Sequence, residues 1–556
     1  MGIRNCLARQ ANALAAVGLL SSASGAYAQS VNPQLSAPIA PLAGRDYTPA
    51  AGQNSIGFYG TDLGFTMKHE GNLRILFGDT WGTSLGTPIS PIGDDSQGAI
   101  CLQAAGCPSG GVPLATGDQV VAYAGNDPDV RKRRGPPIVF RRNLFGKTAS
   151  IVVYPGGPLN IPLTMGEFDT PAAAFSNGLA GNESGAYSLF VRNEPVTCTN
   201  TCSGGFTCDK GALGTNLSGD PCLLGTFGCI RPGLIGGLCV DPTSTRRDST
   251  PAGRLRSIVL RERIGNADPT LHEVYYTTPW DTHKFIDPTT VTVENYSLGP
   301  AVGHFRVGQP TVANPNPSAA PANGNEMVFI WGRPWFLSSS AAQAKMYFAV
   351  VQLPKYNGNG AFPWKPWFYA GPDGQGNPRF SDLETDAVPL ADPNGSTVEP
   401  YDMVNQQSVR WIPQLNKWVM LYGGDSPDAV FLQGLPIVRD PQTPILARFA
   451  DKPWGPWTVG VPIFFGGNAA AASGTYAPGG ISHSPACTGP TCAPGELAFT
   501  LALGRDEPGH LYAVNIIPEW TMDRGATIDL FWNVSTYAPY QVFLMKSTIT
   551  KPVVFQ

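Results

Sequence analysis

The sequence predicts an all-β protein, and more specifically a five-bladed β-propeller. Short runs with strand period follow one another along the chain, separated by turns, and almost no long segment has helical period. These runs form five blocks of three to five strands, and each block is close to the strand content of one propeller blade. The 65 glycines and 53 prolines among 556 residues supply the turns. Because the blocks differ in length, a β-sandwich or two stacked β domains remain as alternatives.

The five blocks are defined by their hydrophobic runs. The expected strands are 63–68, 73–77 and 120–123 in the first block; 138–140, 149–154, 186–191, 258–260 and 274–276 in the second; 303–307, 327–331 and 346–351 in the third; 407–411, 417–422 and 445–448 in the fourth; and 497–501, 529–533 and 541–546 in the fifth.

The N-terminus has the pattern of an export signal. Arg4 and Arg9 precede a short apolar run over 13–20, and Ala26-Tyr27-Ala28 is a small-residue cleavage site. We therefore expect a signal peptide over 1–28, an extended Pro/Ala-rich arm over 29–53, the propeller over 54–556, and a secreted or periplasmic location. No segment is long and apolar enough to predict a membrane span.

The cysteines indicate a disulfide-bonded protein. Without Cys6, which the cleavage removes, ten remain, an even number in an exported chain. Two close pairs lie in Gly/Pro-rich loops, and six more crowd into a predicted insertion of blade two, over 195–251. The pairs are Cys101 with Cys107 and Cys487 with Cys492, and the six are Cys198, Cys202, Cys208, Cys222, Cys229 and Cys239. Zinc is the alternative for the cluster, but it contains no His and no Cys-x-x-Cys spacing. We expect no bound metal and no cofactor.

The first block begins with a β-hairpin that carries an aspartate at each open end. Hydrophobic residues alternate over 63–68 and 73–77, and the turn over 69–72 contains Gly71. Folding the chain about the bond between residues 70 and 71 places Asp62 opposite Asp79, with Cβ atoms about 4.5–5.5 Å apart. Like charges this close repel, so a purely structural hairpin avoids them. A site that needs one protonated and one ionised carboxyl uses such a pair.

Three stretches of the chain resemble one family of enzymes. Gly60-Thr-Asp-Leu-Gly64 followed by Leu76-Phe-Gly-Asp-Thr80 is similar to the start of the endo-D-arabinanase-type glycoside hydrolases. Trp454-Gly-Pro-Trp-Thr458 resembles their recurrent Gly-Pro-Trp turn, and 529–546 resembles their final blade. The resemblance covers most of 54–548 except the cysteine-rich insertion. It implies a five-bladed propeller with Asp62 and Asp79 as the two catalytic carboxylates.

The fourth block departs from that family. Gln407 stands where we expect an acidic residue near the channel, so substrate contacts, or activity itself, can differ. Further candidate substrate-binding residues lie at strand ends or blade entries. They are Asp169, Arg333, His483, Trp81 and Tyr476. Each also has a structural interpretation: a turn aspartate, a partner of Asp62, a buried histidine, or aromatic residues packed between blades.

The leading functional hypothesis is a secreted glycoside hydrolase that cleaves a furanose polysaccharide, an arabinan, with two carboxylates. A non-catalytic carbohydrate- or envelope-binding propeller and a propeller scaffold for protein partners are the alternatives. For the aspartate pair itself, a Ca²⁺ site and a structural pair held by arginine remain open. We find no Gly-x-Ser-x-Gly, His-Glu-x-x-His or P-loop motif.

The charge pattern bears on possible partners. A net charge of −4 argues against nucleic acid, and the basic run over 131–134 is more simply a solvated loop than a site for an anionic polymer. We expect a polysaccharide substrate and a monomeric protein.

The insertion yields the first testable prediction. A Gly-rich segment of this size with few apolar residues cannot build its own core, so cross-links must hold it. Thiol titration of the denatured, unreduced mature protein is therefore expected to find essentially no free cysteine. Several free thiols, or zinc in stoichiometric amount, would contradict three internal disulfides.

Overall fold

A computed structural model of the chain describes part of the 556 residues. The described residues are 31–44, 47, 61–69, 71–78, 96–104, 107, 112–128, 130–140, 152–154, 163–164, 169–177, 185–195, 197–198, 200–201, 207–209, 213–215, 221–223, 237–240, 253–262, 271–278, 284–285, 287–293, 326–333, 345–353, 366–374, 376, 378–392, 395, 407–423, 431–432, 435–436, 444–465, 511–536 and 541–551.

Most of the described strands belong to five sheets, which we number in chain order. Sheet 1 is β2 (Leu63–His69), β3 (Asn72–Phe77), β4 (Ser96–Cys101) and β5 (Val139–Phe140). Sheet 2 is β8 (Asp169–Asn177), β9 (Gly185–Pro195), β15 (Gly253–Glu262), β16 (Leu271–Thr278), β6 (Val152–Tyr154) and β7 (Leu163–Thr164). Sheet 3 is β17 (Asp287–Val293), β18 (Glu326–Arg333), β19 (Tyr347–Leu353), β20 (Pro366–Pro372) and β21 (Pro378–Ser381). Sheet 4 is β22 (Ser408–Ile412), β23 (Lys417–Gly423), β26 (Pro444–Ala450) and β27 (Val461–Phe465). Sheet 5 is β28 (Leu511–Ile516), β30 (Thr527–Thr536), β31 (Gln541–Thr550) and β1 (Val31–Gly44), with β29 (Met522–Asp523) beside β30.

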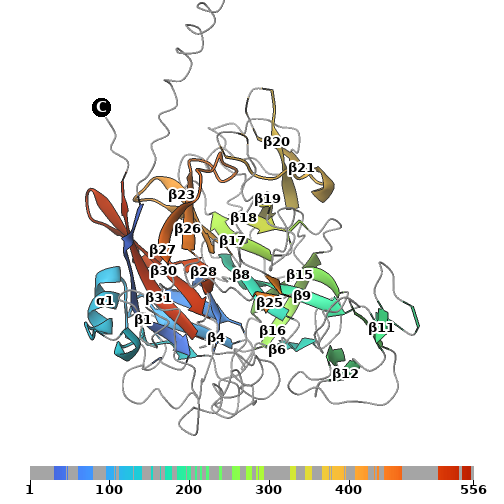
Figure 1. The fold of residues 1–556 in the computed structure, drawn as a ribbon, viewed down its shortest axis with the longest axis horizontal. Coiled ribbons are helices and arrows are strands. Elements are labelled where there is room, and N and C mark those ends of the chain that lie inside the picture. Colours follow the sequence, from blue (N-terminus) through green and yellow to red (C-terminus); the bar gives the residue numbers. More distant parts are fainter. Residues whose placement is uncertain are drawn as a thin grey trace, which may run out of the picture.

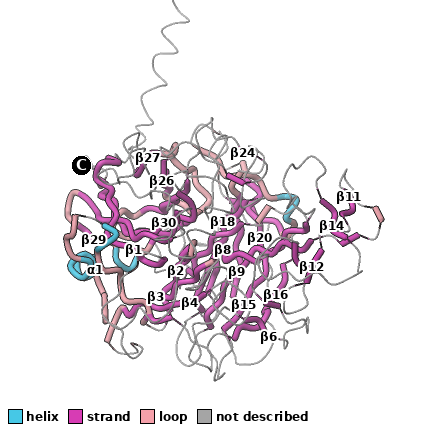
Figure 2. Tube along the Cα trace, turned by 60° about the horizontal axis from the view of Figure 1, so that its bottom comes forward, coloured by secondary structure: helices cyan, strands magenta, loops and turns pink. Residues whose placement is uncertain are grey.

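The five sheets follow one another in chain order, and one edge strand of each sheet, here called its leading strand, contacts the leading strands of two other sheets. Figure 1 shows β8 near β17, and Figure 2 shows β2 near β8. β2 contacts β8, β8 contacts β17, β17 contacts β22, β22 contacts β28, and β28 contacts β2 again. Neighbouring strands within these sheets are antiparallel except for the parallel pair β6 and β16. The described part of the chain is thus an all-β structure of mostly antiparallel sheets, as the sequence predicts, and this is consistent with a β-propeller.

Sheet 5 joins the two ends of the chain. β1, the segment that we expect from sequence as an extended arm, is extended and pairs along β31 from Val31 with Ile549 to Gly44 with Gln541. In Figure 1 the blue β1 lies beside the red β31. Ile39, Leu42 and Ala43 of β1 are buried, so this strand contributes to the core as well as to the sheet.

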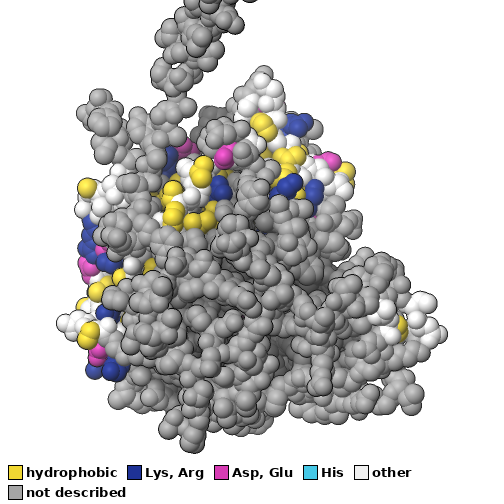
Figure 3. All heavy atoms as spheres, viewed as in Figure 1, with side chains coloured by type: hydrophobic (Ala, Val, Ile, Leu, Met, Phe, Trp, Pro, Cys, Tyr) yellow, Lys and Arg dark blue, Asp and Glu magenta, His cyan; other side chains and the backbone are white. Residues whose placement is uncertain are grey.

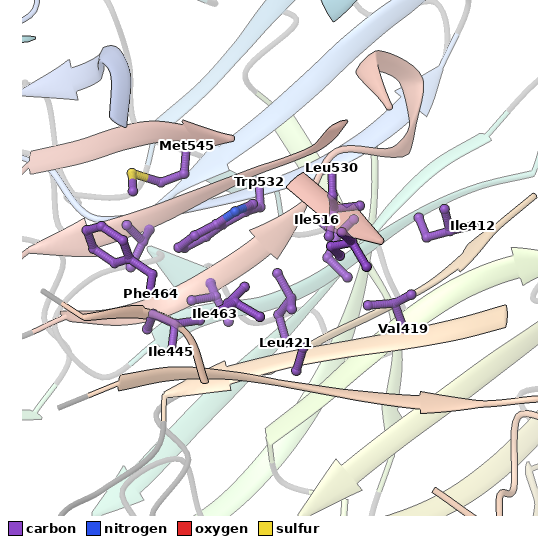
Figure 4. Close-up of a cluster of buried hydrophobic side chains, with 14 of the residues drawn as sticks. Ile412, Val419, Leu421, Ile445, Ile463, Phe464, Ile516, Leu530, Trp532 and Met545 are labelled. Carbon is purple, nitrogen blue, oxygen red and sulfur yellow. The ribbon is translucent and has the colours of Figure 1, made fainter. Parts of the chain in front are cut away.

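The described core consists of three clusters, each between two neighbouring sheets. One lies between sheets 3 and 4 and contains the rings of Trp331 and Trp418, which are tilted by 50° with centroids 5.3 Å apart. A second lies between sheets 4 and 5, where residues such as Leu421 face Trp532 (Figure 4). The third packs sheet 5 against sheet 1. In each of the three clusters, side chains from two neighbouring sheets pack against each other.

One predicted strand is wrong, and another was assigned to the wrong block, because β5 (Val139–Phe140) pairs with β4 in sheet 1 and not with the strands of sheet 2. Residues 120–123 belong to helix α1 (Gly117–Ala124), not to a strand. Thr116 caps the helix: its hydroxyl accepts from the Gln119 amide at 3.3 Å, and the Gln119 side chain accepts from the Thr116 amide at 3.2 Å. This capping box outweighs the β-branched pair Val120-Val121, because it satisfies N–H groups at the start of the helix.

Short 3₁₀ turns and small sheets complete the described structure. The turns are η2 (Val130–Lys132), η4 (Glu384–Asp386) and η6 (Pro518–Trp520). The small sheets are β10 (Thr197–Cys198), β14 (Gly237–Val240) and β11 (Thr207–Asp209); β12 (Leu213–Thr215) and β13 (Pro221–Leu223); and β24 (Phe431–Leu432) and β25 (Leu435–Pro436). The predicted strands 303–307 and 497–501 lie outside the described residues.

Two parts of the disulfide prediction fall on described residues. Cys101 and Cys107 are bonded, as expected. In the insertion, Cys208 is disulfide-bonded and lies opposite Cys239 in the pairing of β11 with β14. The pairing of the remaining cysteines stays a prediction.

The burial of β1 yields the second prediction. Leu42 is fully buried, so we expect Leu42→Ala to lower the free energy of unfolding by about 2–5 kcal/mol, measured by urea denaturation. Leu383→Ala is the matched control, because Leu383 is 58% exposed and its truncation should change stability by about 0.5 kcal/mol or less. Equal midpoints for the two variants would show that β1 is not part of the cooperative core.

Candidate functional site

The hairpin that carries the aspartates forms with the predicted turn, but its register shifts near the open end. The pairs from His69 with Asn72 to Phe65 with Leu76 match a fold about the bond between residues 70 and 71. Beyond them Leu63 pairs with Phe77, one residue out of that register. Gly64 is the extra residue, and both Leu63 and Gly64 have positive φ angles, of 66° and 83°. This is a β-bulge, a feature often found beside active sites, where it redirects a side chain.

The bulge changes what lies opposite Asp62. The Gly78 amide donates to the Asp62 carbonyl at 3.2 Å, so Gly78 and not Asp79 is the cross-strand neighbour of Asp62. The Asp62 side chain lies over Gly78: a Cβ added at residue 78 would overlap Asp62 Oδ1 and would lie 2.6 Å from Leu63 Cδ1. Asp62 is only 6% exposed. Glycine at 78 therefore provides the space that the Asp62 carboxylate occupies, a requirement that the sequence analysis missed.

Four of the sequence-predicted site residues lie outside the described residues. They are Asp79, Trp81, Tyr476 and His483. The roles of these four side chains stay predictions.

Two further aspartates begin leading strands. Asp169 is the first residue of β8, and its backbone pairs with Arg192. Asp287 is the first residue of β17, and its backbone pairs with Arg333, the last residue of β18. Arg333 is fully buried, and a buried guanidinium requires hydrogen-bonding or ionic partners. The sequence analysis missed Asp287, although it precedes proline at a strand start much as Asp169 precedes Thr-Pro.

Gln407 lies deeper than Asp62. It is 1% exposed and precedes Ser408, whose hydroxyl accepts from the Ile516 amide at 3.0 Å. The Ile516 carbonyl in turn accepts from the Thr66 hydroxyl at 3.3 Å. Thr66 is four residues beyond Asp62, about 13 Å along an ideal strand. These bonds connect Ser408, the residue after Gln407, through Ile516 to the middle of β2.

Two half-buried charged residues, Arg410 of β22 and Glu519 of η6, influence each other electrostatically. Arg410 of β22 donates to the Thr66 carbonyl on β2 at 3.0 Å and to the Val409 carbonyl at 2.9 Å. Burial lowers the pKa of Arg410 to about 10, and attraction to Glu519 opposes that shift. Burial likewise raises the pKa of Glu519, which its own backbone and Arg410 counteract. Arg410 thus crosses from sheet 4 to sheet 1 and satisfies a carbonyl on the inner edge of β2.

Other potential sites find limited support among the described residues. No group of three or more His, Cys, Asp or Glu side chains in this part of the chain could hold a metal ion. In the basic run, Arg133 donates to backbone carbonyls of Asp127, Pro38 and Ile39, so it joins η2 to β1. Figure 3 shows acidic and basic side chains interspersed among the coloured atoms of one face. Among described helices, none is long and apolar enough to cross a membrane.

Comparison with known proteins assigns no family. No protein-family model matches the chain, and no curated protein matches it. A protein of unknown function from Dyadobacter fermentans is similar in structure over 94% of this chain and 99% of its own, with 8% identity and a TM-score of 0.33. A mutant Trypanosoma rangeli sialidase that displays trans-sialidase activity is similar over 93% of this chain and 60% of its own, with 9% identity and a TM-score of 0.28. TM-scores this low assign neither a fold nor an activity to this chain.

The contact between Asp62 and Gly78 yields the third prediction. Gly78→Ala adds a methyl group where the Asp62 carboxylate lies, so it should displace that side chain and destabilise the protein by about 1–3 kcal/mol. Gly374→Ala is the control, because a Cβ there meets nothing within 4 Å. Urea denaturation of both variants measures the difference. An unchanged stability for Gly78→Ala would show that Asp62 does not occupy this space.

Proposed function

We propose that the five sheets are the blades of a five-bladed propeller, and that the protein is a secreted glycoside hydrolase with Asp62 and Asp79 as its two carboxylates. The observation that carries the proposal is the hairpin end. The Gly78 amide binds the Asp62 carbonyl, and the Asp62 carboxylate lies over Gly78. The next residue in the chain is the second aspartate.

Hydrolysis of a glycosidic bond matches what two such carboxyls can do. One carboxylic acid protonates the leaving oxygen, and one carboxylate either activates water or attacks the anomeric carbon. The near-complete burial of Asp62 favours the protonated form of a carboxyl. Asp62 is therefore our candidate for the acid, and Asp79 for the base or nucleophile.

The substrate class follows from the sequence resemblance. The motifs over 60–64 and 76–80 are those of endo-D-arabinanase-type enzymes, which points to a furanose polysaccharide, an arabinan. The separation of the two carboxyls distinguishes the stereochemical outcomes. About 5–5.5 Å corresponds to retention, and about 6.5–9.5 Å to inversion.

A non-catalytic carbohydrate-binding propeller is the second candidate. The observation that favours it is Gln407, a buried amide where the resembling enzymes have an acidic residue. An amide binds sugar hydroxyls but cannot exchange protons as a carboxyl does. This candidate predicts sugar binding without hydrolysis.

The fourth prediction tests catalysis. Asp62→Asn and Asp79→Asn keep side-chain size but remove proton exchange, which is typically worth about 10²–10⁴-fold in rate. On an arabinan that the wild-type protein hydrolyses, each variant should lose at least that factor in kcat while still binding the polysaccharide. Lys417→Gln is the control, because Lys417 pairs with Asp451 on the surface of sheet 4. Near-normal kcat in either aspartate variant would place the catalytic pair elsewhere.

A further inference from the structure

Strand β30 of sheet 5 carries two polar side chains at its interface with sheet 1. Phe531, Asn533 and Ser535 alternate on one face of β30, and Phe531 belongs to the core between sheets 5 and 1. Asn533 and Ser535 are both fully buried. Burying an amide and a hydroxyl costs free energy unless their hydrogen bonds are made, so these positions need a reason to be polar.

Both side chains bind the bulge that follows Asp62. Asn533 Nδ2 donates to the Gly64 carbonyl at 2.8 Å, and the Ser535 hydroxyl donates to the Leu63 carbonyl at 3.3 Å. Leu63 and Gly64 are the residues whose positive φ angles create the register shift. A branched residue such as leucine rarely adopts such an angle, so the surroundings must hold it there.

The fit around the bulge is close. A Cβ added at Gly64 would lie 3.2 Å from Asn533 Nδ2 and 3.3 Å from Val542 Cγ1.

The adjacent leading strand has a bulge at the corresponding end: β28 shifts register between Tyr512 and Asn515, where Ala513 has a φ of 53°. Two neighbouring leading strands thus depart from regular pairing near their first residues.

We propose that Asn533 and Ser535 are positioning residues of the candidate site: by binding the carbonyls of Gly64 and Leu63 they fix the bulge that sets the direction of Asp62. Removal of either bond lets the bulge relax toward regular pairing. A one-residue change of register turns a side chain to the other face of a strand. The inference concerns Asp62 as a catalytic acid, so in that respect it rests on the proposed function.

The test combines a structural readout with a kinetic one. The variants are Asn533→Ala and Ser535→Ala, of which the second removes only one oxygen and should fold even if the first does not. The structural readout is hydrogen exchange at the Gly78 amide, which donates to the Asp62 carbonyl only while the shifted register holds. The kinetic readout is kcat and KM on a hydrolysed arabinan.

Each variant should speed exchange at the Gly78 amide and lower kcat by about 10- to 100-fold with KM little changed, since small misplacements of reacting groups cost rates of this order. Ser547→Ala is the matched control: Ser547 is equally buried in sheet 5, but its hydroxyl accepts from Trp532 and Ser36 on the side away from the bulge. It should change neither readout.

Wild-type exchange and kcat in both variants would overturn the proposal, as would the same changes in Ser547→Ala. If the wild-type protein hydrolyses no glycan, the proposed function fails, yet exchange at Gly78 still decides whether Asn533 and Ser535 hold the bulge.

Discussion

The contact between the first and last leading strands, β2 and β28, is the constraint on which the rest of the structure depends. Several hydrogen bonds join these two strands and the sheets to which they belong. Thr66 on β2 donates to the Ile516 carbonyl on β28, and Asn533 and Ser535 bind the start of β2. On the outside, β1 adds the N-terminal segment to the last sheet along β31. Pairing of this kind also protects an edge that would otherwise present free N–H and C=O groups.

The candidate site lies at this same junction. Asp62 immediately precedes the bulge, and the bulge is bound by side chains from the sheet at the other end of the chain. Asn533 and Ser535, which join sheet 5 to sheet 1, are therefore also the residues that we propose fix Asp62. Further along β2, Arg410 donates to the Thr66 carbonyl and so joins sheet 4 to the same strand.

Much of the fold could be predicted because strand period is a local property of the sequence. The alternation over 63–68 and 73–77 predicted the first hairpin and its turn, and the runs over 417–422 and 541–546 lie within observed strands. What failed depends on information that alternation does not carry. Residues 120–123 form a helix because Thr116 and Gln119 cap it. This capping signal is present in the sequence, but the prediction followed the strand preference of the two valines instead. The pairing of β1 with β31 joins segments some 500 residues apart, which no local pattern specifies.

The roles of the two aspartates stay predictions, and the register at the open end of the hairpin differs from the one expected from the sequence. Opposed aspartates follow from counting residues about a turn, but the count assumes regular pairing, and the bulge at Gly64 breaks it. Gly78 and Asn533 could have been found only from contacts between strands.

The most direct test of the account is a crystal structure of Asp62→Asn soaked with an arabinofuranose oligosaccharide. The account predicts a sugar ring at the hairpin end, with its glycosidic oxygen within hydrogen-bond reach of the residue 62 side chain and the Asp79 carboxylate on the other side of the scissile bond, the two carboxyl positions about 5–9.5 Å apart. A sugar bound elsewhere, or residues 62 and 79 pointing to opposite faces of the hairpin, would contradict it.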